Sequence, residues 1–449
     1  MSGDRRTAAA IACAVGCALS LFAQRALFEA AARLQSPVDL FFDPKRPVSA
    51  DVVRSLPYKV VDVVFAPPTS IHVALIVVGV VQALLLLSLY RALRARIVAT
   101  GERAVLALVA AVMFAIAFGA GAIDGFDDYA LAGYAWLGPG HAYAPPAAPL
   151  PGAFSLVSTI WGVPMPPSSD GPGWLALTAA VAGHAPSIGA AIFALRVLEA
   201  LALVALIALV ARRGLGAGAT ALVALNPALY FVYVANAHPD LFAAVLLVGA
   251  LAAVASLPLL AVALIACAAL VKLPMILLAP AVFAARDATR DAIRLRLAYV
   301  VLAAAVALLV SYLLGGVAYF HAAGAELRNA FVPVDRAAAV AVAVRVGLLI
   351  VAAVALVTVF VRGTARPASA WSLIALSPPI VPAALAWTLP YAAQARAALV
   401  PVLILLPVVA ALLDVSFPHA GLGLLTMFAV LVWAVVENVR ARRTGSAGR

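Results

Sequence analysis

Long apolar runs recur along the whole chain, and they constrain its fold more than any motif does. They begin near residue 7 and recur to about residue 436, and a membrane-spanning helix needs about 20 such residues. Of the 449 residues, 66% are hydrophobic and only 11% are charged, whereas a soluble domain carries roughly 25% charged residues. A soluble enzyme, a DNA-binding module and a disordered scaffold are therefore excluded. The pattern predicts an all-α, polytopic transmembrane helical bundle of about ten to twelve helices.

The positive charges lie at the ends of these runs. The net charge is +11, from 30 Lys and Arg against 19 Asp and Glu. The basic residues form short clusters at 5–6, 91–96, 212–213, 286–296 and 440–443. Such clusters beside helix ends stay on the cytoplasmic side and set the topology. Nucleic-acid binding favours diffuse basic patches instead, so we predict the membrane as a partner and no nucleic acid.

The apolar runs divide the chain into three parts. Residues 1–103 form an N-terminal segment of two membrane helices, at 7–27 and 71–90, joined by an external loop. Residues 104–437 form the transmembrane core, and 438–449 are a basic tail. Inside the core, residues 124–172 are rich in Pro and Gly, which disfavour a long helix. We therefore expect a large external loop there, with short pieces of structure.

Further helices are expected in the core at 104–123, 187–210, 217–234, 241–257, 297–314, 337–361, 370–389, 397–413 and 422–436. The apolar stretch 173–183 is too short to span and is expected to lie along the interface. Residues 315–336 are expected to form an external loop, and residues 390–396 a short external turn.

The run from residue 259 to residue 285 is different, because Lys272-Leu-Pro274 interrupts its middle. As one span it would place the 286–296 cluster outside, against the positive-inside bias. Two half-helices meeting near Lys272 avoid that problem, and irregular backbone at membrane depth is tolerated where protein or a cavity covers it. We therefore predict a re-entrant hairpin that lines a cavity.

Three sets of polar residues are candidates for chemistry. Asp127 and Asp128, followed by Tyr129, can provide a general base or hold a divalent cation, or simply form a solvated helix cap. Asn236, His238 and Asp240 form a dense polar group between two apolar helices, although Asn and Asp also suit a turn. Lys272 is about a dozen residues from either polar boundary, so binding an anion is favoured over snorkelling.

Other polar residues give weaker signals. Arg396 follows Trp387, Tyr391 and Gln394 at the expected external turn, where it either clamps a phosphate or anchors the interface. Arg196 and Glu199 lie three residues apart on one apolar helix and are expected to neutralise each other. The three cysteines, at 13, 17 and 267, lie within apolar runs without metal-binding spacing.

Four ordered segments resemble motifs of GT-C type membrane glycosyltransferases, closest to bacterial polyprenyl-phosphate-mannose-dependent α-mannosyltransferases. Asp127-Asp-Tyr-Ala-Leu-Ala-Gly-Tyr-Ala followed by Gly140-His-Ala-Tyr143 resembles the group's first-loop motif DD-x-YSY…G-x-x-PY. Ser169-Asp-Gly-Pro-Gly-Trp174 resembles S-x-YGPLW, with Asp170 where tyrosine is usual. Asn226-Pro227 through Asp240 resembles NP…GNGHND, and Ala269-Leu-Val-Lys-Leu-Pro274 resembles LxKxP. Pro390-Tyr391 is a weaker match to a late PWY motif.

The resemblance implies a bacterial inner-membrane, multi-pass enzyme that uses a polyprenyl-phosphate sugar donor, with mannose or another hexose as the sugar. It would transfer the sugar to a lipid or glycan acceptor on the external face, without metal or cofactor. Asp128 would be the base, with Asp127 as its alternate, and Lys272 with Arg396 would hold the donor phosphate. The remaining predicted substrate-binding residues are Tyr129, Asp170, Asn236, His238, Asp240 and Tyr391.

Ala235 and Ala237 replace glycines of the family pattern, and Pro239 replaces its second asparagine. Two alternatives therefore stay open. One is a transporter or flippase for a lipid-linked or amphipathic solute, in which Lys272, Arg345 and Glu199 line a path. The other is a catalytically inactive relative of these transferases.

Overall fold

The computed structural model describes residues 3–34, 69–94, 97–119, 127–283, 290–329, 336–362 and 382–416, together with 428–429, 431–432 and 435–436. Within these residues the regular structure is helical throughout, without a β-strand. The all-α prediction is therefore confirmed for the part of the chain that is described.

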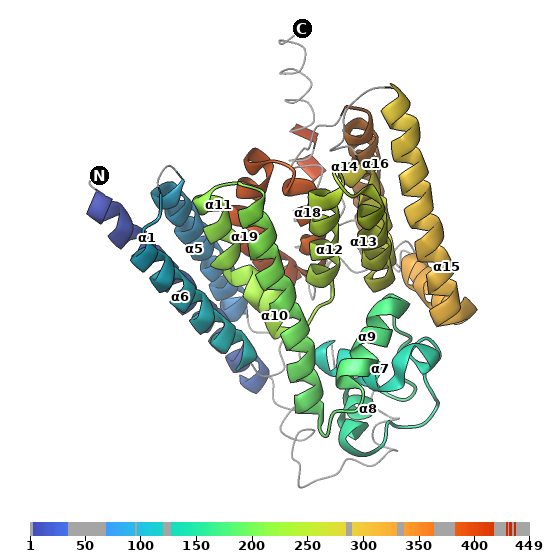
Figure 1. Ribbon diagram of the computed structural model, residues 1–449. Helices are drawn as coiled ribbons and strands as arrows, with labels where there is room; N and C mark the ends of the chain where they lie inside the picture. The colour runs from blue at the N-terminus through green and yellow to red at the C-terminus, as the bar shows by residue number, and fades with distance from the viewer. Residues whose placement is uncertain are drawn as a thin grey trace.

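Three long helices form one side of the bundle (Figure 1). They are α1 (Gly3–Leu34), α5 (Thr69–Leu93) and α6 (Thr100–Phe118). The first two contact each other extensively, and Gln82 Nε2 of α5 donates a hydrogen bond to Gln24 Oε1 of α1, 2.9 Å away in the buried interface. Such a bond satisfies two polar groups where apolar helix faces meet.

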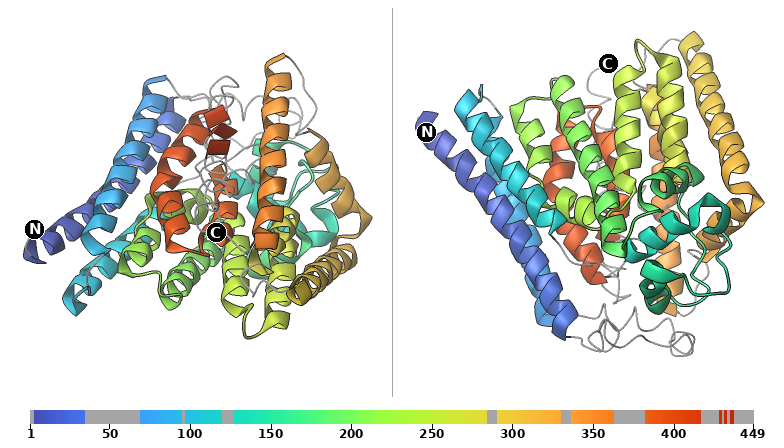
Figure 2. Two further views of the ribbon diagram at one scale, coloured as in Figure 1. Left: turned by 90° about the horizontal axis from the view of Figure 1, so that it is seen from above. Right: turned by 60° about the horizontal axis from the view of Figure 1, so that its bottom comes forward.

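A group of short helices lies at one end of the bundle, at the lower right in Figure 1 and in the right-hand view of Figure 2. It contains α7 (Asp127–His141), η2 (Gly152–Phe154), α8 (Ser155–Trp161) and α9 (Pro172–Ala182). The short pieces of structure expected within 124–172 are thus helical, and the longest of them, α7, is kinked at Gly138 (φ 65°), just before Pro139.

The centre of the molecule is built from one long helix and several short ones. They are α10 (Ile188–Arg212), α11 (Ala217–Ala224), η3 (Leu229–Ala235), α12 (Asp240–Ala253), α13 (Pro258–Val271), η4 (Leu273–Leu278) and α14 (Ala279–Phe283). The predicted helix at 217–234 is broken, since α11 and η3 meet at 47°. The break falls at Asn226-Pro227, where proline cannot continue the hydrogen-bond ladder.

The remaining helices close the other side. They are α15 (Arg290–Asn329), α16 (Arg336–Arg362), η6 (Pro382–Thr388), α18 (Leu389–Ala392) and α19 (Arg396–Ser416). The expected loop at 315–336 is wrong over residues 315–329, because α15 continues to Asn329 after a kink at Gly316 (φ 59°). Most of the helices expected at 370–389 and 422–436 lies outside the described residues.

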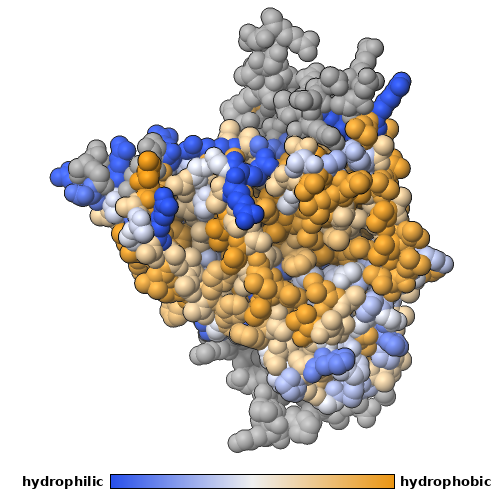
Figure 3. All heavy atoms as spheres, in the orientation of Figure 1, coloured by the Kyte–Doolittle hydropathy of each residue, from blue (hydrophilic) through white to orange (hydrophobic). Residues whose placement is uncertain are grey.

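Six of the described helices are long and apolar enough to cross a membrane, or seven spans if the bent pair α11 and η3 is counted as one. The six are Asp4–Glu29, Ser70–Leu93, Thr100–Phe118, Ile188–Arg212, Ile293–Ala325 and Arg396–Leu413. The surface view agrees, since a broad apolar band crosses the molecule below a hydrophilic edge (Figure 3). The chain is therefore a multi-pass membrane protein.

One end of the bundle carries several basic residues of the spanning helices. Helices α1, α6 and α15 begin at the upper end in Figure 1, and α10 ends there. Those ends carry Arg5, Arg6, Arg103, Arg212, Arg290 and Arg294. By the positive-inside bias this end is expected to face the cytoplasm, which puts α7–α9 on the external side.

Candidate functional site

A cluster of one lysine and two aspartates lies where several short helices meet. Lys272 Nζ is 3.3 Å from Asp170 Oδ1 and 3.8 Å from Asp240 Oδ2. The three side chains are 22%, 9% and 2% exposed, so the charges are largely withdrawn from water. Because buried charges are costly without partners, the mutual neutralisation explains how this cluster is tolerated.

Lys272 is placed by the break between α13 and η4. It ends α13 in extended conformation (φ −147°, ψ 111°), and Pro274 occupies the first turn of η4. Pro274 has no backbone N–H to donate to the carbonyl of Leu270 four residues earlier, so α13 cannot continue through it. The predicted interruption at Lys272 is confirmed as a break between two helical segments.

Asp170 reaches Lys272 because its backbone lies directly against the end of α13. Gly171 N donates to Val271 O at 2.7 Å, and a Cβ atom on Gly171 would lie only 2.1 Å from Leu270 O. On the other side, Tyr143 donates its hydroxyl proton to the carbonyl oxygen of Asp170 at 2.8 Å. A side chain at position 171 would prevent this approach, so glycine is required here for steric reasons.

Replacing Gly171 with alanine is therefore expected to destabilise the protein by about 1–3 kcal/mol, because the backbone around Leu270 must shift. Thermal unfolding in detergent measures the effect. The matched control is Gly324→Ala in α15, where a Cβ meets no atom within 4 Å. Equal melting temperatures for the two variants would contradict the close contact.

Asp240 begins α12 and follows a strained turn. Ala237 has φ 56° and is the non-glycine residue with positive φ among those described. The carboxylate then accepts a hydrogen bond at Oδ1 from Trp387 Nε1, 2.6 Å away. Trp387 comes from η6, and both side chains are buried, so the indole fixes the orientation of Asp240.

The strain at Ala237 predicts a specific difference between two glycine variants. A left-handed conformation costs an ordinary residue roughly 1–2 kcal/mol, and Ala237→Gly relieves this cost. Ala235 is equally buried but lies within η3. Ala235→Gly therefore loses a buried methyl group and increases the entropy of the unfolded chain, without any relief of strain. We expect the Ala237→Gly protein to be more stable than the Ala235→Gly protein by about 1–2 kcal/mol in denaturant unfolding. Equal stabilities would argue against a strained turn.

A second ion pair joins three helices near the α7–α9 group. Arg196 of α10 places Nη2 3.1 Å from Asp128 Oδ2 of α7, and its Nη1 donates to Phe118 O at the end of α6, 3.2 Å away. Asp128 is only 1% exposed, which excludes the solvated helix cap. The expected pairing of Arg196 with Glu199 is wrong, since Arg196 turns toward Asp128 instead.

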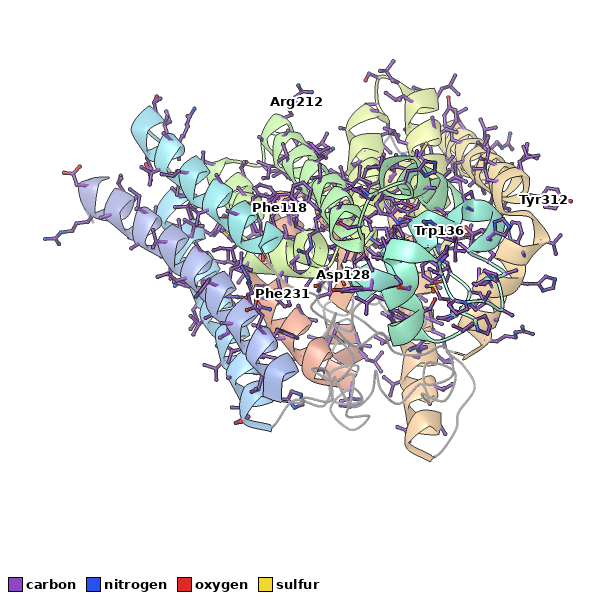
Figure 4. All side chains as sticks on the ribbon, turned by 90° about the horizontal axis from the view of Figure 1, so that it is seen from below. Phe118, Asp128, Trp136, Arg212, Phe231 and Tyr312 are labelled. Atoms are coloured by element: carbon purple, nitrogen blue, oxygen red, sulfur yellow. The ribbon has the colours of Figure 1, made fainter. Side chains whose placement is uncertain are left out.

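The surroundings of Asp128 suit a base that works near neutral pH. Burial raises the pKa of Asp128 to about 7, and the opposing attraction of Arg196 keeps it from rising further. Its Oδ1 atom accepts no well-formed hydrogen bond from the described residues. Seen from below, Asp128 lies near the middle of the molecule, between the α1–α6 side and the α7–α9 group (Figure 4).

His238 and Asn236 belong to the turn that carries Asp240. Burial lowers the pKa of His238 to about 4, with Lys272 adding to this effect and Asp240 opposing it, so the imidazole is neutral at pH 7. Asn236 is buried. Burial and Lys272 also act on Asp170: burial raises the pKa of this carboxyl group, and the charge of Lys272 lowers it. These four predicted residues, with Lys272, thus form one neighbourhood.

The other predicted residues are Tyr129, Tyr391, Asp127 and Arg396. Tyr129 follows Asp128 on α7, and Tyr391 is buried in α18. Asp127 begins α7, but its side chain lies outside the described residues. Arg396 begins α19 and contacts the end of α5: its Nε donates to Tyr90 Oη at 3.0 Å and its Nη2 to Arg94 O at 3.1 Å.

Sequence reasoning missed two features of the site. The sequence predicts Trp387 only as a neighbour of Arg396, whereas its indole bonds Asp240 directly. It predicts Glu199 as the partner of Arg196, whereas Glu199 is fully buried and is influenced by the charge of Asp240. Residues three apart share one helix face at different heights, so the spacing of Arg196 and Glu199 on α10 also allows each of them a different neighbour.

No family model, curated protein or solved structure matches this chain. Among the described residues, no three His, Cys, Asp or Glu side chains come together in a way that could hold a metal ion. The site can therefore be interpreted only from its own chemistry: a partly buried lysine paired with two aspartates, polar side chains near it, and a separate buried carboxylate with a pKa near neutrality.

Proposed function

We propose that this protein is a GT-C type membrane glycosyltransferase. It would transfer a sugar, mannose or another hexose, from a polyprenyl-phosphate donor to a lipid or glycan acceptor. The reaction would take place on the external face of a bacterial inner membrane, without metal or cofactor.

One observation supports this proposal above the others. Asp170, Asp240, Lys272 and Trp387 are separated by up to 217 positions in the sequence, yet they contact one another in a single cluster. Three of them belong to the ordered segments that resemble the transferase motifs, and Trp387 lies just before the weaker Pro390-Tyr391 match. Unrelated chance matches to short motifs would have no reason to meet in space.

The depth of the cluster fits a lipid-linked donor. Helices α12 and α13 each have 14 residues, which corresponds to about 21 Å. Asp240 and Lys272 lie at the ends of this antiparallel pair, so they are about 20 Å from its turn, within a hydrocarbon core of about 30 Å. In the proposal α13, η4 and α14 form the re-entrant hairpin. The hairpin places Lys272 where the hydrocarbon core meets the headgroups of the external leaflet, so that it can contact a polyprenyl phosphate.

The proposed reaction is an inverting displacement. The acceptor oxygen attacks the anomeric carbon while the bond between that carbon and the phosphate oxygen breaks, and polyprenyl phosphate leaves. Asp128 takes the proton of the acceptor hydroxyl, and Lys272 attracts the phosphate. Asn236, His238, Asp240 and Asp170 would shape the sugar site, with Tyr129 and Tyr391 at its borders.

Two features modify the roles expected from the sequence. Arg396 is removed from the donor site, since its contacts are with Tyr90 and Arg94. Arg196 is added as the residue that positions Asp128. Because Asp128 is 1% exposed, the acceptor must displace covering side chains before it reaches the carboxylate.

The proposal is tested with the purified wild-type protein in liposomes that contain decaprenyl-phosphate [14C]mannose and a membrane-lipid acceptor extract. The expected result is radiolabelled acceptor in the presence of protein only. If the radiolabelled donor instead crosses the bilayer chemically unchanged, the transferase is rejected in favour of a transporter. Absence of both transfer and transport, with intact folded protein, would reject both.

A transporter or flippase is the second candidate, and the Lys272 cluster is the observation that favours it. Coupling-ion sites of transporters lie at breaks in membrane helices near mid-depth. Here a lysine and two carboxylates lie where α13 stops and α12 begins, beside the bent pair α11 and η3. The liposome experiment separates this candidate from the transferase, because transport leaves the glycosidic bond intact.

A further inference from the structure

Arg94 and Arg396 form a basic junction at one end of the bundle, and the proposed reaction gives neither of them a role. Arg94 directly follows the spanning segment Ser70–Leu93, and Arg396 is the first residue of the spanning segment Arg396–Leu413. Both therefore lie where a membrane helix leaves the hydrocarbon core, at the level of the lipid headgroups. Helix α6 begins at Thr100, shortly after Arg94, so the junction belongs to the end that the positive-inside bias assigns to the cytoplasm.

The guanidinium group of Arg396 is held in one orientation. Its Nε donates to Tyr90 Oη at 3.0 Å, its Nη2 donates to Arg94 O at 3.1 Å, and its Cζ lies 5.5 Å from the centre of the Tyr90 ring. These contacts leave Nη1 without an acceptor among the described residues, so its N–H groups are available to a ligand. Because the orientation is already fixed, little side-chain entropy is lost when a ligand binds.

Glycine keeps side chains away from this guanidinium group. Gly216, just before α11, has φ 94°, and a Cβ atom there would lie 3.5 Å from Nη1 of Arg396. Gly218 packs against the end of α5, where a Cβ atom would lie only 2.9 Å from Cδ2 of Tyr90. The backbone at the start of α11 thus approaches the junction closely without placing a side chain beside Nη1.

The positive charge of the junction is not compensated within the described part of the chain. Neither Arg94 nor Arg396 pairs with a described carboxylate, and the side chain of Arg94 is exposed. Arg91, one turn earlier on α5, is exposed as well. This end of the molecule forms the hydrophilic edge above the apolar band (Figure 3). Arginine side chains bind phosphate groups through several N–H donors at once, so the junction is suited to a phosphate.

The surroundings favour a lipid as the source of that phosphate. Ile97, three residues after Arg94, is 90% exposed, and it lies in the short link between α5 and α6. An isoleucine side chain at headgroup level gains free energy when acyl chains cover it, which a soluble anion cannot do. The cytoplasmic leaflet is also the one rich in anionic lipids, which basic segments beside membrane helices attract.

We propose that the junction of α5, α11 and α19 binds one anionic phospholipid of the cytoplasmic leaflet, whose phosphate contacts Arg396 and Arg94. The acyl chains of this lipid would lie beside Ile97. The inference does not depend on the proposed function, because neither arginine takes part in the proposed reaction.

Native mass spectrometry of the full chain in detergent tests the proposal, because it counts bound lipids and gives their apparent affinity. The probes are dioleoylphosphatidylglycerol and dioleoylphosphatidylcholine, which share the phosphate diester and the acyl chains but differ in net charge. We expect one molecule of phosphatidylglycerol to bind about tenfold or more tightly than phosphatidylcholine, since a hydrogen bond to a charged group contributes that much or more. Glycerophosphoglycerol, the same headgroup without acyl chains, should bind much more weakly.

Two variants and a control locate the site. Arg396→Gln and Arg94→Gln should each weaken binding of phosphatidylglycerol about tenfold. Arg94→Gln keeps the backbone carbonyl that orients Arg396, and its exposed position lets the test proceed even if Arg396→Gln fails to fold. The matched control is Arg103→Gln, an exposed arginine in the first turn of α6 at the same end, which should bind as the wild type does.

Four results would each overturn the proposal. They are equal binding of the two lipids, binding of glycerophosphoglycerol as tight as that of the lipid, full binding in both folded arginine variants, and an equal loss in Arg103→Gln. The second result would indicate a site for free phosphate, and the last would indicate a diffuse attraction to positive charge.

Discussion

Sugar transfer is expected to fall about a thousandfold when Asp128 is replaced by asparagine, since a positioned general base contributes roughly 10²–10⁴-fold to a rate. Asparagine keeps the size of the side chain and can still accept a hydrogen bond from Arg196. It cannot take a proton from the acceptor hydroxyl. Transfer of [14C]mannose in liposomes measures the loss, and binding of methyl farnesyl phosphate, a short-chain phosphodiester analogue of the donor, should remain close to that of the wild type.

The pH profile adds a second readout that a merely structural role would not change. The pKa of Asp128 is raised to about 7 by burial, and the base acts only when ionised. The wild-type rate should therefore rise with pH up to about 7 and then level off. Arg196 lowers this pKa, so Arg196→Gln should move the rising limb to higher pH.

Glu29→Gln is the matched control, because Glu29 is a partly exposed carboxylate that pairs with Arg25 on α1, separately from Asp128 and Arg196. It should leave both the rate and the pH profile unchanged. Full activity of folded Asp128→Asn protein would remove Asp128 as the base. A rising limb that stays in place in Arg196→Gln would show that another group titrates.

The second large effect is expected from Lys272→Met. Methionine fills a similar volume but leaves Asp170 and Asp240 without their cation, and Asp240 is 2% exposed. Breaking a buried ion pair on one side costs about 3–5 kcal/mol, and the partial exposure of Lys272 reduces this to about 2–4 kcal/mol. We therefore expect a clearly lower melting temperature in detergent, together with loss of donor binding.

A triple variant separates the loss of stability from the loss of donor binding. Combining Lys272→Met with Asp170→Asn and Asp240→Asn removes the uncompensated charges, so much of the lost stability should return. Donor binding should stay absent, since no cation remains at the site. If the triple variant bound methyl farnesyl phosphate as tightly as wild type, Lys272 would not be the phosphate ligand. If Lys272→Met alone were as stable as wild type, the ion pairs would contribute nothing measurable.

The sequence predicted the long helices well, because membrane helices are encoded by local runs of apolar residues. The expected helices at 71–90, 187–210 and 397–413 agree within a few residues with α5, α10 and α19. It failed where Pro and Gly are expected to prevent a helix or to end one. At Gly138-Pro139 and at Gly316 they produce kinks within α7 and α15 instead, because tertiary packing can hold the helix on both sides.

The sequence predicted several residues of the candidate site, but it did not predict which of them contact one another. The break at Lys272 followed from one proline in an apolar run, but the partners of Lys272 are 32 and 102 positions away. Nothing local specifies such contacts. Arg196 illustrates the same limit: Glu199 is its neighbour in sequence, whereas Asp128, 68 positions away, is its partner. Helix rotation and the position of α7 decide between them.

The backbone hydrogen bond from Gly171 to Val271 has a mechanical consequence. It fastens the outer group of short helices to the point where α13 stops, one residue before Lys272. A displacement of that group is thus passed directly to the backbone at Lys272, without a flexible side chain between the two segments. A molecule that binds the surface of α7–α9, such as an antibody fragment, is expected to restrict the backbone that carries Lys272.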